Sequence, residues 1–132
     1  MSTHEILHPV SWKRTPGYSN GIAATGLTIF LAGQIGWDGD QQFVSDGLVG
    51  QTAQALRNIV DLLAEGGARP EHIVRMTWYL TDRDEYLANQ RPLGDVYREV
   101  IGKHFPAMTL VQVGALVESR AKVEIEATAV VP

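Results

Sequence analysis

The stretch LVGQTAQALRNIVDLLAE, residues 48–65, carries the clearest structural signal in the sequence. Its apolar positions recur every three or four residues, the spacing that places side chains on one stripe of an α-helix. This stripe contains Leu48, Thr52, Ala55, Leu56, Ile59, Leu62 and Leu63. Ser45 or Asp46 is suited to cap the first turn, and Gly66-Gly67 is suited to end the helix. We therefore predict an amphipathic helix of about 18 residues with one buried face.

The segments after this helix alternate between strand and helix patterns. Over residues 74–80, Val, Met, Trp and Leu occupy every second position, with Arg, Thr and Tyr between them, which predicts a strand. A second helix is predicted from Asp82 to Gly102, because Asp82 and Glu85 have the spacing of a capping box and Pro92 is suited to start or kink its second half. Alternation over 109–115 and 122–130 predicts two further strands.

The segments before the helix are shorter and more polar. Residues 22–24 and 27–32 are apolar runs around Thr25-Gly26, which predicts a β-hairpin. Residues 36–47 are rich in glycine and polar residues and are expected to form a loop. His4 and His8 fall in an N-terminal segment expected to be irregular. The predicted element order is therefore β-β-α-β-α-β-β.

Composition defines the class of the protein without indicating its function. The chain has 132 residues, 45% of them hydrophobic, and no internal repeat or linker, so we predict a single domain over residues 1–132. The net charge of −4 provides no basic field for a nucleic acid or an anionic membrane. Cysteine is absent, which excludes thiolate chemistry and disulfides. Without an apolar run long enough to span a membrane or a signal-peptide pattern, the expected location is cytoplasmic.

The predicted sheet has a second face that two helices cannot cover. Thr77 and Tyr79 lie opposite the buried positions of their strand, and both faces of the strand over 109–115 carry apolar residues. A second copy of the chain would cover this face. The alternative is that these are scattered apolar residues on an ordinary surface.

Few residues have the spacing of a known catalytic constellation. The four histidines are not clustered, so no metal site is predicted, and no serine lies in a G-x-S-x-G elbow. Glu124 and Glu126 share one face of the last strand, where a carboxylate either meets solvent or serves a cleft. Tyr18 follows a turn-forming Pro-Gly pair and either projects into a cleft or packs.

Five segments in order resemble motifs of the Rid or YjgF family, the reactive intermediate deaminases formerly called L-PSP endoribonucleases. The sequence has GYSN at 17–20 where the family has G-P-Y-S-Q, and LAGQI at 31–35 where it has S-G-Q-I. It continues with QTAQALRNI at 51–59, FPA at 105–107 and VEIEA at 123–127. The resemblance covers nearly the whole chain.

This resemblance implies an α+β fold like that of chorismate mutase, a β-sheet with two helices on one face. It also implies a homotrimer with clefts between subunits and no cofactor. In deaminating members, water attacks the C=N carbon of a 2-imino acid or its enamine tautomer and releases ammonia. By the same resemblance, Glu124 orients the water, Tyr18 is the cleft tyrosine, and the substrate-binding positions are Ala32, Gly33, Met108, Thr109 and Leu110.

The sequence departs from the family at the residue that grips the substrate carboxylate. An arginine follows Pro-Ala in deaminating members, and Met108 stands there instead, with no charge and no donor. Ala32 likewise replaces the family's serine. Arg14 and Arg120 are candidates to replace the missing arginine.

Three functions follow from these residues. The first is imine or enamine deamination with altered specificity. The second is a non-catalytic trimer that binds a small ligand in the same intersubunit cleft. The third, the older endoribonuclease activity, is disfavoured by the acidic balance and the lack of a basic cluster.

Overall fold

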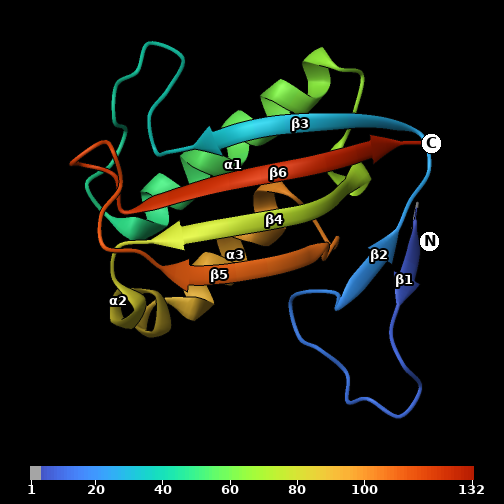
Figure 1. Cartoon of the computed structure of the whole chain (residues 1–132). Coiled ribbons are helices and arrows are strands. Elements are labelled where there is room, and N and C mark those ends of the chain that lie inside the picture. The colour runs from blue at the N-terminus through green and yellow to red at the C-terminus, as the bar shows by residue number, and fades with distance from the viewer. Residues whose placement is uncertain (1–3) are drawn as a thin grey trace.

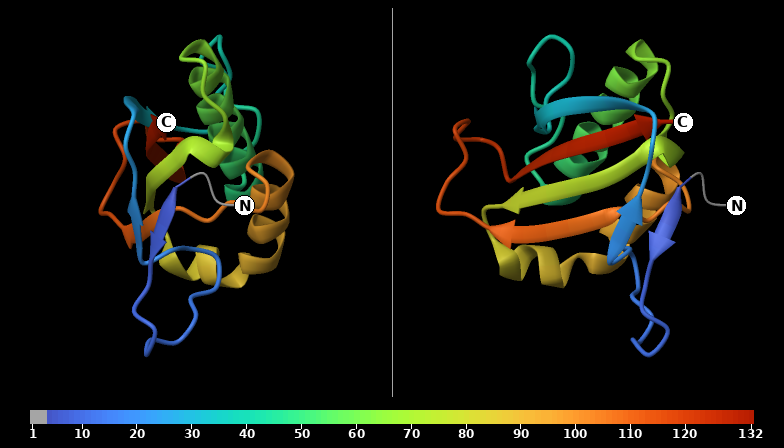
Figure 2. Two further views of the ribbon diagram at one scale, coloured as in Figure 1. Left: turned by 90° about the vertical axis from the view of Figure 1, so that its right-hand side faces the viewer. Right: turned by 45° about the vertical axis from the view of Figure 1, so that its right-hand side comes forward.

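The computed structural model describes residues 4–132 and shows a four-stranded mixed sheet with helices packed on one of its faces and a two-stranded sheet beside it (Figures 1 and 2). The strands are β1 (Glu5–Leu7), β2 (Gly21–Ala23), β3 (Leu27–Gln34), β4 (Ile73–Leu80), β5 (Ala107–Gln112) and β6 (Val123–Val131). The helices are α1 (Leu48–Glu65), α2 (Arg83–Ala88), α3 (Gln90–Val100) and a short 3₁₀ turn, Pro70–His72. The α+β class is confirmed.

The main sheet has four strands in the order β3-β6-β4-β5. β6 is antiparallel to both of its neighbours, and β4 runs parallel to β5. The registers place Tyr79 opposite Glu124 and Thr77 opposite Glu126. Because side chains alternate between faces, all four of these residues lie on one face of the sheet.

The helices bury the opposite face. Leu56, Ile59 and Leu63 of α1 are fully buried in the core between the helices and the sheet, where Met76 of β4 and Ile125 of β6 are also fully buried. Burying such side chains contributes roughly 1.5–3 kcal/mol each relative to exposure. The periodicity of residues 48–65, 74–80 and 122–130 therefore predicted most of the core, but Leu62 of the predicted helical stripe is 39% exposed.

The face turned away from the helices, here called the outer face, is open in the single chain (Figure 2). It carries Phe30, which is 78% exposed, and Val111, which is 40% exposed, together with Thr77 and Tyr79. The predicted uncovered second face is thus present.

The expected hairpin over residues 22–32 is wrong. β2 pairs with β1, and β3 pairs with β6 instead. Gly26 explains the separation, because its φ of +147° is open only to glycine and a Cβ there would overlap the Val131 carbonyl at the end of β6. The turn therefore docks on β6 and directs β3 away from β2.

The N-terminal segment is more ordered than the sequence suggested. Residues 5–23, here called the arm, form the two-stranded sheet β1-β2 and the loop that joins its strands, beside the main sheet (Figures 1 and 2). β1 contains only three residues, too few for a visible alternation. Two-stranded sheets are marginal alone, so the arm depends on its contacts with the rest of the chain.

The helix ends differ in part from expectation. Gly47 is the N-cap of α1 without a side-chain cap, because Asp46 pairs with Arg120 and the Ser45 hydroxyl accepts from Gly47 N instead. Gly66 is the C-cap of α1, as predicted. Asp82 caps α2 as expected, but the predicted second helix is broken at Asn89, with Pro92 in the first turn of α3.

Candidate functional site

Glu124 and Gly33 lie in contact on the outer face. A Cβ on residue 33 would overlap the Glu124 Oε2 and lie 2.8 Å from its Cγ and Cδ. The β3 register shifts between Leu31 and Gln34, so Ala32 and Gly33 occupy an irregular stretch of strand. The missing side chain of Gly33 makes room for the carboxylate.

Two residues of α1 hold the strands that carry this pair. Gln51, which is fully buried, donates from Nε2 to the Arg120 carbonyl (3.0 Å) and accepts from Lys122 N at Oε1 (2.8 Å). Asn58 donates to the carbonyls of Ile35 and Trp37. The polar residues of the 51–59 motif therefore fix the start of β6 and the end of β3, on either side of Glu124 and Gly33.

The second carboxylate of the outer face is already engaged. The Tyr79 hydroxyl donates to Glu126 Oε1 at 3.0 Å. This hydrogen bond is the main cause that raises the pKa of Tyr79, with desolvation and the negative charges of Glu126 and Glu124 acting in the same direction. Glu126 therefore accepts from a phenol, whereas no described residue donates a hydrogen bond to the Glu124 carboxylate.

A hollow of about 330 Å³ opens beside Glu126 on the outer face. Its lining includes Phe30, Ala32, Arg75, Thr77 and Thr128. Ala32 is exposed here, so one predicted substrate-binding position faces open space on the outer face.

Tyr18 lies at the other end of the sheet. Ser19 forms a bridge with Ala107, its N–H donates to the Pro106 carbonyl (3.0 Å) and its hydroxyl donates to the Phe105 carbonyl (2.6 Å). These contacts place Tyr18 at the start of β5, where it is 39% exposed and lines a cavity between the arm and the body of the domain.

One chain does not bring Tyr18 and Glu124 together. Ser19 is level with Ala107, whereas Glu124 is level with Tyr79 and Val111. Four residues along β5 correspond to roughly 13 Å, and two strand spacings add about 10 Å across the sheet. A site that uses both side chains therefore needs a second copy of the chain.

The predicted substrate-binding residues of β5 divide between the two faces. Met108 pairs with the buried Met76, and both Met108 and Leu110 pack against the hydrophobic core. Thr109 pairs with Thr77 and is exposed on the outer face. The structure thus places Thr109, but not Met108 or Leu110, on the face of Glu124.

The two candidate replacement arginines have different surroundings. Arg120 pairs with Asp46 at 2.6 Å and its guanidinium lies 4.8 Å from the centre of the Phe43 ring. Arg14 lines the same cavity as Tyr18. The structure therefore separates the two candidates, with Arg120 bound to other groups and Arg14 beside a predicted site residue.

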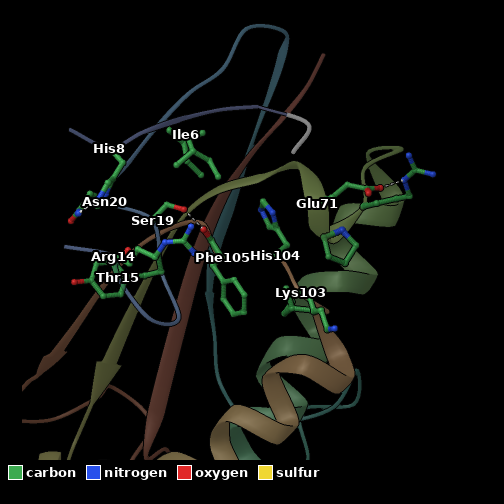
Figure 3. A pocket seen from close by; sticks show the side chains of 15 residues that line it. Ile6, His8, Arg14, Thr15, Ser19, Asn20, Glu71, Lys103, His104 and Phe105 are labelled. Atoms are coloured by element: carbon green, nitrogen blue, oxygen red, sulfur yellow. Dashed lines mark hydrogen bonds and ion pairs between the residues drawn. The ribbon is translucent and has the colours of Figure 1, made fainter. Parts of the chain in front are cut away.

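Sequence reasoning missed the cavity itself. Its lining joins residues of the arm to Lys103 and His104, which follow α3, and to Glu71 in the 3₁₀ turn (Figure 3). No local pattern joins positions so far apart, because their proximity depends on the two hydrogen bonds of Ser19. Within residues 4–132, no group of three or more His, Asp or Glu side chains is arranged to hold a metal ion.

No helix in the described part of the chain is both long enough and apolar enough to cross a membrane.

The chain is similar over most of its length to members of one protein family. The profile of the family described as Endoribonuclease L-PSP matches residues 11–131. A human protein named 2-iminobutanoate/2-iminopropanoate deaminase is 31% identical over 130 residues, covering 95% of this chain and 90% of its own. A Capra hircus protein of the same name is 38% identical over 104 residues, covering 78% of this chain and 72% of its own. A relative from Arabidopsis thaliana is named Reactive Intermediate Deaminase A, chloroplastic, and is 34% identical over 91% of this chain and 64% of its own.

Solved structures show the same fold. A Yersinia pestis protein of unknown function from the conserved Rid family superposes with a TM-score of 0.87 at 27% identity, covering 99% of this chain and all of that one. A Mycobacterium tuberculosis member of the YjgF/YER057c/UK114 family has a TM-score of 0.65 at 34% identity, covering 88% of each chain.

Proposed function

Because the chain belongs to the Endoribonuclease L-PSP family, also called the Rid or YjgF family, we propose that it is a hydrolytic deaminase of small imines or enamines. The observation that carries this proposal is the contact between Glu124 and Gly33. It leaves one carboxylate at the outer face with no described donor, beside backbone that has no side chain in the way. Such a carboxylate is suited to accept a proton from water.

The proposed reaction balances as a hydrolysis. Glu124 takes a proton from water while the water oxygen bonds to the carbon of the C=N group, and the protonated carboxyl gives that proton to the nitrogen, which leaves a neutral carbinolamine. Glu124 then takes the hydroxyl proton of the carbinolamine, and an equivalent proton passes to the amino nitrogen as the C–N bond breaks and the C=O bond forms, which releases ammonia and a 2-oxo product and leaves Glu124 ionised. No oxidant or cofactor is required.

We further propose that the site lies between subunits of a homotrimer, with Glu124 and Gly33 from one chain and Tyr18 from its neighbour. The separation of these residues within one chain supports this arrangement, and so does the open outer face with Phe30 and Val111. Isologous or cyclic contacts between identical chains are the usual way to cover such a face. The expected cytoplasmic location remains part of the proposal, although the relative from Arabidopsis thaliana is named chloroplastic.

The specificity proposed for the site differs from that of the deaminating relatives. Met108 has neither the charge nor the donors of an arginine, and Ala32 lacks a hydroxyl. Ala32, which is exposed on the outer face, also favours a second candidate, a non-catalytic trimer that binds a small apolar ligand in the same cleft. An activity assay separates the two candidates.

The assay generates a 2-imino acid in place with an amino acid oxidase and traps the surviving imine with semicarbazide. We expect the wild-type protein to lower semicarbazone formation and the Glu124→Gln protein to leave it unchanged. Glu99→Gln, which makes the same charge change on the exposed surface of α3, serves as the control and retains the wild-type effect. If the wild type does not compete with semicarbazide for any imino acid, the deaminase proposal is wrong and the binding candidate stands. RNA cleavage that depends on Glu124 would instead support the older family label.

A further inference from the structure

The cavity between the arm and the body of the domain, here called the arm cavity, has a volume of about 830 Å³. Figure 3 shows Arg14 and Asn20 of the arm on one side and Lys103 and His104 of the body on the other. The arm is anchored beside the cavity by the two hydrogen bonds of Ser19 to the backbone of residues 105–106. The walls therefore come from distant segments that the fold holds in fixed positions.

The charge of the arm cavity is opposite to that of the protein. Two of its charged groups, Arg69 and Glu71, neutralise each other in an ion pair at 2.6 Å. Arg14 and Lys103 remain, and neither has a hydrogen bond or ion pair with any residue in 4–132. A chain with a net charge of −4 thus directs two unpaired cations to one cavity. Cations grouped in this way attract an anion.

The remaining lining suits a ligand with an apolar body. Ile22, Ile101 and Phe105 contribute apolar surface, and the Phe105 ring stacks on Tyr97 with centroids 5.9 Å apart. Tyr18 adds a phenol, and the Thr15 hydroxyl fixes its backbone by donating to the Tyr18 carbonyl at 2.7 Å. A few polar groups among apolar ones are typical of small-molecule sites.

We propose that the arm cavity binds the carboxylate of a 2-imino or 2-oxo acid with a branched apolar side chain, and that Arg14 and Lys103 hold this carboxylate in place of the arginine that Met108 replaces. The inference rests on the proposed deaminase function, because Tyr18 is shared between the arm cavity and the proposed intersubunit site. Arg120, the other candidate, is bound to Asp46 and Phe43.

The first test measures binding without turnover. The probe is 4-methyl-2-oxopentanoate, a stable acid of the class that deamination would release, and its neutral counterpart is 4-methyl-2-pentanone, in which a methyl group replaces the carboxylate. Calorimetry and amide chemical-shift titration of the wild-type protein are expected to show saturable binding of the acid, with shifts around residues 14–20 and 103–105. The ketone is expected to bind at least roughly tenfold more weakly, since charge-assisted hydrogen bonds are lost.

Three variants assign the binding to individual charges. Arg14→Gln and Lys103→Gln are each expected to weaken binding of the acid roughly tenfold, whereas Arg14→Lys retains part of it. Lys13→Gln is the matched control. It also removes one positive charge, but Lys13, the residue next to Arg14, has a side chain that does not line the arm cavity. Its affinity is expected to stay within about twofold of wild type, since only screened long-range attraction is lost. Equal binding of acid and ketone, or equal weakening by Lys13→Gln, overturns the proposal.

Kinetics distinguish this inference from the deaminase proposal. With a branched 2-imino acid, Arg14→Gln is expected to raise KM roughly tenfold and to leave kcat unchanged, as for a residue that contributes ground-state binding. If the wild type binds the oxo acid through Arg14 but deaminates nothing, the proposed function fails and the carboxylate site stands. If the wild type deaminates and Arg14→Gln changes neither KM nor binding, the carboxylate site is wrong and the deaminase proposal stands.

Discussion

Gly33→Ala is expected to separate activity from stability, because the three atoms nearest to the added methyl group all belong to one flexible side chain, that of Glu124. Its Cβ would overlap Oε2 of Glu124 and lie 2.8 Å from Cγ and Cδ, well inside the 3.5–4.0 Å at which carbon atoms pack. The carboxylate must therefore move by on the order of 1 Å, and a displacement of that size in a catalytic group costs about 100-fold in rate.

The stability of the Gly33→Ala protein is expected to change little. Replacing glycine inside a strand by alanine stabilises by roughly 0.5–1 kcal/mol, and a side chain pushed off its rotamer costs about 0.5–1.5 kcal/mol. These effects nearly cancel, so the free energy of unfolding should stay within about 1 kcal/mol of wild type. Urea unfolding measures this value, and the semicarbazide competition assay measures the rate.

The control for this change is Gly39→Ala, which adds the same methyl group where no atom lies within 4 Å. It is expected to retain both rate and stability. The reasoning is refuted if Gly33→Ala keeps its rate within threefold of wild type while Glu124→Gln is inactive, because the reacting carboxylate would then not lie against Gly33. A loss of more than about 2 kcal/mol in the free energy of unfolding would show instead that the Glu124 side chain cannot move aside to accommodate the added methyl group.

Three further changes test the scaffold by urea or thermal unfolding. Gly26→Ala is expected to destabilise by about 2–4 kcal/mol, because its φ of +147° and the nearby Val131 backbone exclude a Cβ, and a loss under 1 kcal/mol would contradict this. Gln51→Leu should cost about 2–4 kcal/mol, because its buried amide hydrogen-bonds to Ser45, Arg120 and Lys122; an unchanged protein would show that these bonds are dispensable. Burial raises the pKa of the Tyr97 hydroxyl in the folded protein above its value in the unfolded chain. The free energy of unfolding of the wild type, compared with that of Tyr97→Phe, is therefore unaffected by this group's ionisation below about pH 10. Above that pH the wild type loses stability relative to Tyr97→Phe by about 1.4 kcal/mol per pH unit, until the pH reaches the folded-state pKa. A difference between the two proteins that does not vary from pH 8 to 11 would be inconsistent with that burial.

Periodicity predicted the parts of the fold that are long and half-buried. The apolar residues recur with a helical period over 48–65 and at every second position over 74–80, because one face of each element meets the core. The helix α1 and the strand β4 could therefore be identified from the sequence. β1 has three exposed residues and therefore no alternation. The false hairpin around Thr25-Gly26 has a different cause, because a Gly-containing turn between two apolar runs specifies a bend but not the strands that pair beyond it.

The candidate site was accessible from the sequence only in part. Glu124 and Glu126 share a face as their spacing requires, but the contact of Glu124 with Gly33 depends on the register of β3 against β6 and the shift within it. The grouping of Arg14 with Lys103 depends on where the arm docks, which Ser19 determines through hydrogen bonds to residues 105–106. Long-range pairings of this kind carry no local sequence signal.

The central claim, that the active site combines Tyr18 of one chain with Glu124 of another, is tested most directly by mixing two inactive variants. Tyr18→Ala and Glu124→Gln proteins are prepared separately, unfolded, combined in equal amounts and refolded together, and deamination is measured by semicarbazide competition. Each variant alone is expected to be inactive. In a cyclic trimer assembled at random, about one quarter of the sites receive an intact Tyr18 and an intact Glu124, so activity should return to about one quarter of wild type. A mixture as inactive as its components, formed from variants shown to assemble together, would contradict the shared site.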